Sequence, residues 1–89
     1  MDEAVAVSLE YHGRFRQMAG ADREVVPVPP TLAEAVSAVG GYVQERYGIT
    51  PPYIMMINNR HVVGAMKHEG ARPLKESDVF RLLPVISGG

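Results

Sequence analysis

The stretch PLKESDVFRLLPVISGG, residues 73–89, decides the fold class, and it falls into three parts. A polar connection comes first, the apolar run VFRLLPVI follows, and the pair Gly88-Gly89 closes the stretch. The apolar run predicts a strand over 79–86, and Pro84 limits its ladder pairing because proline has no N–H to donate. Because glycine is about 7% of average composition, Gly-Gly occupies the last two positions of a chain by chance in about one case in 200. We therefore interpret the pair as functional.

Two further strands are predicted near the N-terminus. Val5–Gly13 alternates apolar and polar residues, which is the period-two pattern of a half-buried strand. Glu24–Pro30 is short and apolar, and its prolines fit an edge strand that ends by Pro29. The polar residues between these strands contain a turn signal around Gly20 to Asp22, and no helix is predicted there.

Thr31 begins the one predicted helix. Thr31 and Glu34 have the spacing of a capping box, in which each side chain accepts the backbone N–H of the other residue. The apolar residues that follow recur at helical spacing and form one stripe: Leu32, Ala35, Val36, Val39 and Val43. The helix is therefore predicted from Leu32 to about Tyr47, with Gly48 as its C-terminal cap.

Pro52–Ala65 contains two apolar runs on either side of Asn58-Asn59. Because asparagine tolerates the left-handed backbone of a tight hairpin turn, we predict a strand, a turn and a strand here. The full order is then strand, strand, helix, strand, strand, strand. This order indicates an α+β domain with one main helix packed on one face of the sheet. The other face is expected to be polar or to dock a partner.

The composition indicates one small domain and argues against several classes of protein. At 89 residues, the chain can bury one modest core. It has no cysteine, which excludes disulfides, cysteine metal sites and a cysteine nucleophile. The net charge of −1 argues against a nucleic-acid-binding domain, and no apolar run reaches the roughly 18–20 residues of a membrane span. We expect a cytoplasmic protein without a metal site.

Four segments of the chain together resemble the β-grasp sulfur carriers, and most of all the small subunit of molybdopterin synthase. The segments are LEYHGRFRQMAG (9–20), TLAEAVSAV (31–39), MMINNRHV (55–62) and PLKESDVFRLLPVISGG (73–89). The resemblance implies a ubiquitin-like β-grasp fold, with a mixed sheet of four to five strands. It also implies two parts of the chain, a β-grasp domain over 1–83 and a flexible C-terminal Gly-Gly tail over 84–89.

The same resemblance implies a co-substrate, or the small subunit of a molybdopterin-synthase-type sulfurtransferase, without catalytic side chains of its own. A ubiquitin-activating-type enzyme would use ATP to adenylate the Gly89 carboxylate, because a carboxylate is a poor electrophile. Sulfur would then displace AMP and leave a thiocarboxylate. This group would donate sulfur in molybdopterin synthesis, to the large subunit or to another sulfur-accepting enzyme. No cofactor is expected on the chain itself.

The other tail residues are expected to thread the tail into a partner's narrow slot. Gly88 would give clearance because it has no side chain, and its backbone can bend freely. Ser87, Ile86 and Val85 would line the approach to the reacting end. Pro84 would stiffen the base of the tail, where the last strand ends.

Three alternatives share the predicted fold. The chain could carry sulfur for thiamine, for cysteine or for another metabolite. It could also be a ubiquitin-like modifier whose Gly89 forms an isopeptide bond with a lysine of a target protein. In the third alternative the tail is idle, and the domain serves only as an interaction module.

Two surface groups stand out besides the tail. The resemblance places His12, His61 and Leu83 where such carriers expose apolar residues on the open sheet face, so we expect a partner-docking face that is more polar than usual. Separately, Arg14, Arg16 and Arg23 form a loose basic group near the first turn. This group is either a solvated loop or a contact for an acidic partner surface.

Overall fold

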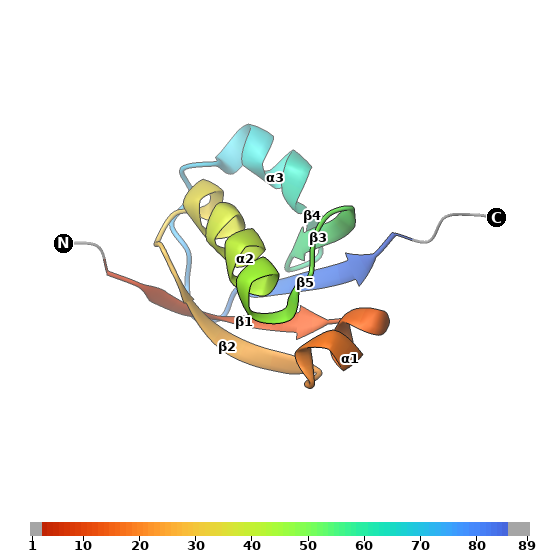
Figure 1. The fold of residues 1–89 in the computed structure, drawn as a ribbon. Coiled ribbons are helices and arrows are strands. Elements are labelled where there is room, and N and C mark those ends of the chain that lie inside the picture. Colours follow the sequence, from red (N-terminus) through yellow and green to blue (C-terminus); the bar gives the residue numbers. More distant parts are fainter. Residues whose placement is uncertain (1–2, 86–89) are drawn as a thin grey trace.

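The computed structural model describes residues 3–85, which form five strands and three helices. Figure 1 shows their arrangement, with α2 and α3 above the sheet. In chain order the elements are β1 (Val5–Tyr11), α1 (Arg14–Ala19), β2 (Arg23–Val28), α2 (Leu32–Tyr47), β3 (Tyr53–Ile57), β4 (Arg60–His61), α3 (Val62–Glu69) and β5 (Val79–Pro84). Within these residues, no helix is long and apolar enough to cross a membrane.

The five strands form one mixed sheet in the order β2-β1-β5-β3-β4. β1 and β5 pair in parallel at its centre, with Ser8 opposite Val79 and Tyr11 opposite Leu82. The β1–β2, β3–β4 and β3–β5 pairs are antiparallel. Because β1 and β5 run in the same direction, both strands end at the same edge of the molecule. β2 lies at the edge of the sheet, as its prolines predicted.

The core lies between the sheet and α2. Alternate residues of the central strands face the helix and are fully buried, including Val7 and Leu9 on β1 and Phe80 and Leu82 on β5. The buried residues of α2 lie on one stripe: Leu32, Ala35, Val39 and Val43. The predicted strand of 5–13 and the predicted helix of 32–47 therefore form because each sequence period buries one face.

The ends of α2 confirm one cap and correct the other. Gly48 ends the helix in the left-handed conformation, with φ of 70°, as predicted. Thr31 is extended and precedes the helix, but its hydroxyl donates to the Glu34 carboxylate at 2.8 Å. The predicted capping box is therefore wrong, since the Thr31 side chain accepts no backbone N–H. The two side chains satisfy each other instead.

Two helices were missed by the sequence patterns. Arg14–Ala19 forms α1, a helix of six residues in which only Phe15 is buried, so its apolar period is too short to read. Val62–Glu69 forms α3, although the pattern predicted a strand up to Ala65. Val62 and Ala65 are buried three residues apart, whereas Val63 is 62% exposed. β4 is consequently reduced to two residues.

The last strand is shorter than the predicted 79–86, because β5 ends at Pro84. Pro84 pairs with Tyr53, the first residue of β3, and the pairing with β1 ends at Leu82. Val85 therefore has no partner strand to continue the ladder, and Ile86 lies outside the described residues. The predicted division of the chain at residue 83 stays a prediction.

Candidate functional site

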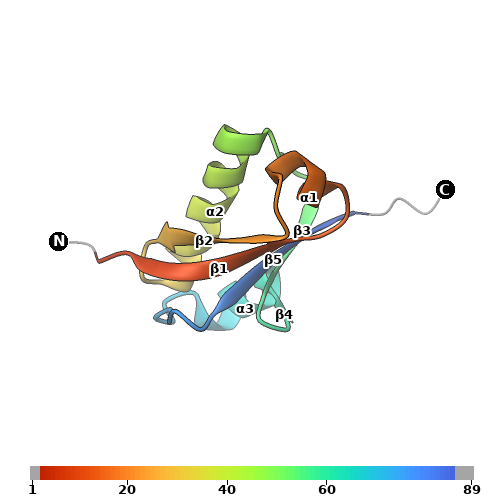
Figure 2. The ribbon, with the colours of Figure 1, turned by 90° about the horizontal axis from the view of Figure 1, so that it is seen from below.

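The end of β5 is fastened to the turn that follows β1. The His12 N–H donates to the Leu82 carbonyl at 3.0 Å. Gly13 lies against Pro84 so closely that a Cβ on Gly13 would be 2.8 Å from the Pro84 Cγ. Gly13 also has a φ of 59°, which favours glycine. Both views place α1 beside the end of β5 (Figures 1 and 2). This junction holds the end of β5 against the β1–α1 turn.

The predicted tail residues divide between the described and the undescribed parts of the chain. Pro84 closes β5, and Val85 follows it with 44% of its surface exposed. Ile86, Ser87, Gly88 and Gly89 lie outside the described residues. Their roles in threading and reaction stay predictions.

One row of side chains crosses the sheet on the face opposite α2. The strand register aligns Glu10 with both Arg23 and Arg81, and then Arg81 with Met56 and Met56 with His61. We name these five residues the cross-sheet row. Arg81 binds the Glu10 carboxylate through Nε at 2.9 Å and also donates to the Asn58 carbonyl. The centre of the open face is therefore an ion-paired strip.

The positive groups around Glu10 stabilise its ionised form. The hydrogen bond from Arg81 lowers the pKa of Glu10 more than burial raises it, and the nearby charges of Arg81, Arg23 and His12 lower it further. Arg23 and the His12 ring each lie 3.6 Å from the Glu10 carboxylate. Glu10 therefore stays ionised and tied to the sheet at neutral pH.

The three predicted docking residues occupy different parts of this face. Leu83 pairs with Ile54 on the side of the row nearest the tail, and His12 follows the last β1 residue beside them. His61 lies at the far end of the row on β4, where its Nδ1 accepts the Val63 N–H at 3.4 Å and caps α3. The structure therefore brings Leu83 and His12 together and places His61 apart from them. Their docking role stays a prediction.

Sequence reasoning missed the ion pair between Glu10 and Arg81. The two residues are 71 positions apart, and only the register of the parallel β1–β5 pair brings them together. The available signal was an outward-facing charge on each of two predicted strands. Opposite charges on neighbouring strands stabilise their pairing, so this pairing could have been proposed.

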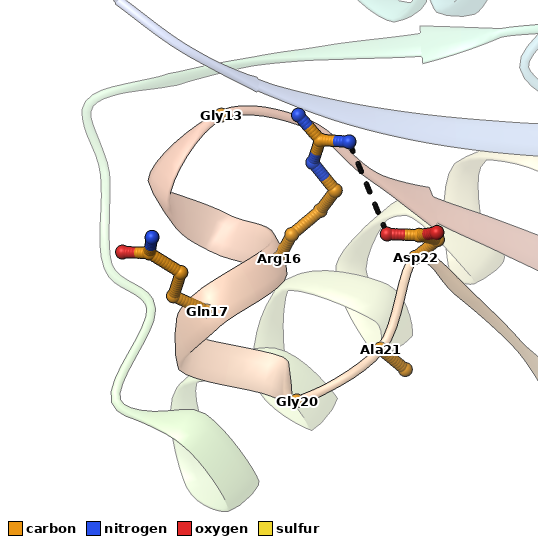
Figure 3. Close-up of a pocket in the computed structure, with 6 residues that line it drawn as sticks. All are labelled: Gly13, Arg16, Gln17, Gly20, Ala21 and Asp22. Carbon is orange, nitrogen blue, oxygen red and sulfur yellow. Dashed lines mark ion pairs between the residues drawn. The ribbon is translucent and has the colours of Figure 1, made fainter.

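Basic residues surround the junction where β1 and β5 end. Arg14 and Arg16 are exposed on α1, and Arg23 begins β2. A shallow hollow of ≈520 Å³ lies between α1 and the connection that leads to β2, and Figure 3 shows Arg16 and Asp22 facing each other across it. A second hollow of ≈230 Å³ shares these two residues and includes Arg23. We name Arg14, Arg16, Arg23 and Asp22 the tail-base surface.

Asp78 forms a buried ion-pair cluster at the opposite end of β5. Its side chain is 4% exposed and accepts two hydrogen bonds from Arg72, at 3.0 and 3.2 Å. The Asn58 amide and the Lys75 N–H donate to it as well, at 3.0 and 2.9 Å. Burial raises the pKa of Asp78, but these hydrogen bonds outweigh burial and lower it to about 2. The cluster fixes the start of β5.

A second carboxylate binds three tyrosines on the core side of the sheet edge. The hydroxyls of Tyr11, Tyr42 and Tyr47 donate to Glu24 at 2.7, 2.5 and 2.6 Å. Burial raises the pKa of Glu24, and the three hydroxyl donors lower it to a net value below the usual range. The cluster ties β2 to α2 and stabilises the sheet edge beside the tail-base surface.

Neither cluster offers a binding site for a metal. Among residues 3–85, no group of three histidine, cysteine, aspartate or glutamate side chains is placed to hold a metal ion. Asp78 and Glu24 are each enclosed by their own hydrogen-bond donors. The open sheet face and the tail-base surface are both within reach of a partner.

Solved structures share the fold of this protein over nearly the whole length of the chain. A small archaeal modifier protein, SAMP1, from Methanosarcina acetivorans superposes with a TM-score of 0.68 at 15% identity, covering 97% of this chain and 98% of that chain. The HVO 2177 protein from Haloferax volcanii gives 0.69 at 19% identity, covering 98% and 89%. The chain has the ubiquitin-like β-grasp fold. The fold class predicted from the sequence is thus confirmed.

A third likeness bears on the resemblance read from the sequence. A putative molybdopterin converting factor, subunit 1, from Pyrococcus furiosus gives a TM-score of 0.60 at 23% identity, covering 91% of this chain and 99% of that chain. No family model and no curated protein matches the chain. At these identities the likenesses establish the fold, and they confirm at that level the resemblance to small β-grasp carriers.

Proposed function

We propose that the protein is a ubiquitin-like sulfur carrier that works through the carboxyl group of Gly89 in molybdopterin synthesis. The observation that carries this proposal is the position of Pro84. Pro84 is the last residue of β5, the central strand of a β-grasp sheet, and it lies five residues before Gly89 and in close contact with Gly13. In the sequence, the Gly88-Gly89 pair is therefore separated by three residues from a fixed point of the fold.

The proposed chemistry has several steps, and other proteins supply the catalytic groups. In the first step, a Gly89 carboxylate oxygen attacks the α-phosphorus of ATP on a ubiquitin-activating-type enzyme and releases pyrophosphate. In the second step, a persulfide-derived sulfur adds to the acyl carbon, and AMP leaves. This addition gives an acyl disulfide, and a second thiol of the sulfur-donating protein then attacks the sulfur on the protein side of its S–S bond. The S–S bond breaks, which leaves the thiocarboxylate on Gly89 and a disulfide on the sulfur donor. The thiocarboxylate sulfur is then transferred to the pterin precursor on a large-subunit partner. The chain contributes the reacting end and the surfaces that position it.

The open sheet face supports a role in docking these partners. Leu83 and Ile54 form a partly buried apolar pair on the tail side of the cross-sheet row. A partner that covers this pair also lies beside Pro84 and Val85. One surface can therefore dock the domain while the tail enters the partner's slot.

Conjugation to protein targets is the second candidate function. It is favoured by the likeness to a small archaeal modifier protein, which covers 97% of this chain. It uses the same adenylated Gly89, but a lysine amine attacks in place of sulfur. The two candidates therefore diverge only after activation.

The proposal is tested by ATP–pyrophosphate exchange with the ubiquitin-activating-type enzyme of the same organism. We expect the full chain to support exchange, and deletion of Gly89 to abolish it while the thermal unfolding temperature stays unchanged. A matched control replaces Val63, which is exposed on α3, with alanine. Exchange that persists without Gly89 would overturn the assignment of the reacting end.

A further inference from the structure

The arginines of this protein are held in two different ways. Arg72 makes two short hydrogen bonds to buried Asp78, and Arg81 binds both Glu10 and the Asn58 carbonyl. Arg16 and Arg23, in contrast, lie 3.9 and 3.6 Å from their nearest carboxylates, and more than half of each side chain is exposed. Such long, exposed pairs contribute little to stability. These two guanidinium groups are therefore free to bind something else.

Arg14 is oriented without a carboxylate partner. Its guanidinium carbon lies 5.2 Å from the centre of the Phe15 ring, and Phe15 is only 1% exposed. A cation above an aromatic face is held in place electrostatically. Among residues 3–85, no aspartate or glutamate forms an ion pair with Arg14. The charge is thus presented outward on a fixed ring.

The tail-base surface is positive on a chain that is otherwise acidic. Outside the tail-base surface, the chain has six of its nine lysines and arginines and nine of its ten aspartates and glutamates. Two carboxylates lie near these arginines, Asp22 and Glu10, and Glu10 is bound more closely by Arg81, at 2.9 Å. The opposite hollow, at the other end of β2, is lined by Glu3 and Glu34 and by no basic side chain. The molecule therefore has a positive end beside the tail.

We propose that the tail-base surface binds acidic side chains that border the tail-binding slot of the activating enzyme. The inference rests on the proposed function, because it names the chemistry of the partner that takes Gly89. Gly13 joins the β1–α1 turn to Pro84, so an enzyme that grips the tail must pass beside α1. The chain's net charge of −1 disfavours nucleic acid as the occupant.

The charges act on the association rate more than on the chemical step. Complementary charges at the rim of an interface speed encounter, and salt weakens them because the Debye length shortens from ~10 Å at 0.1 M to ~3 Å at 1 M. Reversing them should therefore raise the KM for this protein and leave kcat alone. It should also flatten the salt dependence.

The test compares two double variants with the same change in net charge. Arg14→Glu with Arg16→Glu alters the tail-base surface and leaves the Arg23–Glu10 pair in place. Lys67→Glu with Lys75→Glu alters two exposed lysines on α3 and the connection after it. The probe is the purified ubiquitin-activating-type enzyme of the same organism. ATP–pyrophosphate exchange gives KM and kcat, and calorimetric binding without ATP gives Kd, each at low and high salt.

We expect the arginine variant to raise KM and Kd about tenfold at low salt and less than about twofold at high salt, with kcat unchanged. The lysine variant should follow the wild type. Equal KM, Kd and salt dependence for the two variants would overturn the inference and leave the function of Gly89 standing. A third outcome is that the wild type binds in a salt-dependent way, the arginine variant does not bind, and the wild type supports no exchange. This outcome would support the inference and refute adenylation. Absence of both binding and exchange by the wild type would contradict both.

Discussion

The two ends of β5 hold their charges differently. At the start of the strand, Asp78 is buried and receives four hydrogen bonds, two of them from Arg72. At the other end, beside Pro84, the tail-base surface presents guanidinium groups whose nearest carboxylates lie 3.6 to 3.9 Å away. Both ends belong to one strand at the centre of the sheet. The charges at the start of the strand stabilise the fold, and the charges at its end are exposed to solvent.

This difference separates stability from binding within a small domain. A buried charge with all its partners is costly to disturb, because its neighbours are left unpaired in a low dielectric. An exposed charge with distant partners can change without loss of folding. Substitutions at the start of β5 should therefore lower stability, whereas substitutions at its end should alter partner binding.

The largest effect is expected from Asp78→Asn. The neutral amide turns an N–H₂ donor toward Arg72 and the Lys75 N–H, so the free energy of unfolding should fall by about 3 kcal/mol. Urea unfolding at neutral pH measures this change. Glu76→Gln, at an exposed position of the same turn, is the matched control and should cost less than about 0.5 kcal/mol. A loss below about 1 kcal/mol at Asp78 would contradict the assigned role of the cluster.

Acid should remove the stabilisation that Asp78 provides. Its pKa in the folded protein is about 2, below the ordinary 3.8, so folding favours the ionised form. The contribution, about 2 kcal/mol, is complete above roughly pH 5 and is lost as the pH falls toward 2. The gap in unfolding free energy between wild type and Asp78→Asn should therefore narrow across this window. A gap independent of pH would show that charge is not its cause.

The stability of the contact between Gly13 and Pro84 should depend on backbone conformation and steric fit rather than on charge. Gly13→Ala introduces a Cβ 2.8 Å from the Pro84 Cγ at a φ of 59°, and we expect a loss of about 2 kcal/mol. Gly41→Ala is the control, since a Cβ there meets nothing within 4 Å and the residue lies inside α2. That change should stabilise the protein by about 0.5–1 kcal/mol. Thermal or urea unfolding distinguishes opposite signs for the two substitutions.

The smallest effect on stability is expected at the tail-base surface itself. Arg14→Glu with Arg16→Glu should change the unfolding free energy by less than about 1 kcal/mol, because the side chains are exposed and weakly paired. The same urea experiment measures it. A loss comparable to that of Asp78→Asn would erase the contrast between the ends of β5.

Local patterns were sufficient to predict the elements that bury one continuous face. The stripe from Leu32 to Val43 and the left-handed Gly48 defined α2, and the alternation around Leu9 defined β1. α1 was missed because a six-residue helix with one buried side chain has no readable period. α3 was missed because a short apolar run fits a strand and a helix equally well, and burial of Ala65 decides between them.

The polar contacts depend on strand register and helix packing, so most of them could not be predicted from the sequence. Glu10 meets Arg81 only through the parallel pairing of β1 with β5, and Glu24 meets Tyr42 and Tyr47 only because α2 crosses the sheet edge. The basic group near the first turn was visible as sequence. Its position beside Pro84 came from the Gly13 contact.

The central claim, that Gly89 carries sulfur, is tested most directly by the intact mass of the protein purified from its native host. A carrier should show a fraction whose mass exceeds that of the unmodified chain by the difference between sulfur and oxygen, and an alkylating reagent should shift that fraction. Tandem mass spectrometry should place the change on Gly89. Protein isolated only as the plain carboxylate, or with Gly89 linked to a lysine of another protein, would contradict the sulfur-carrier account.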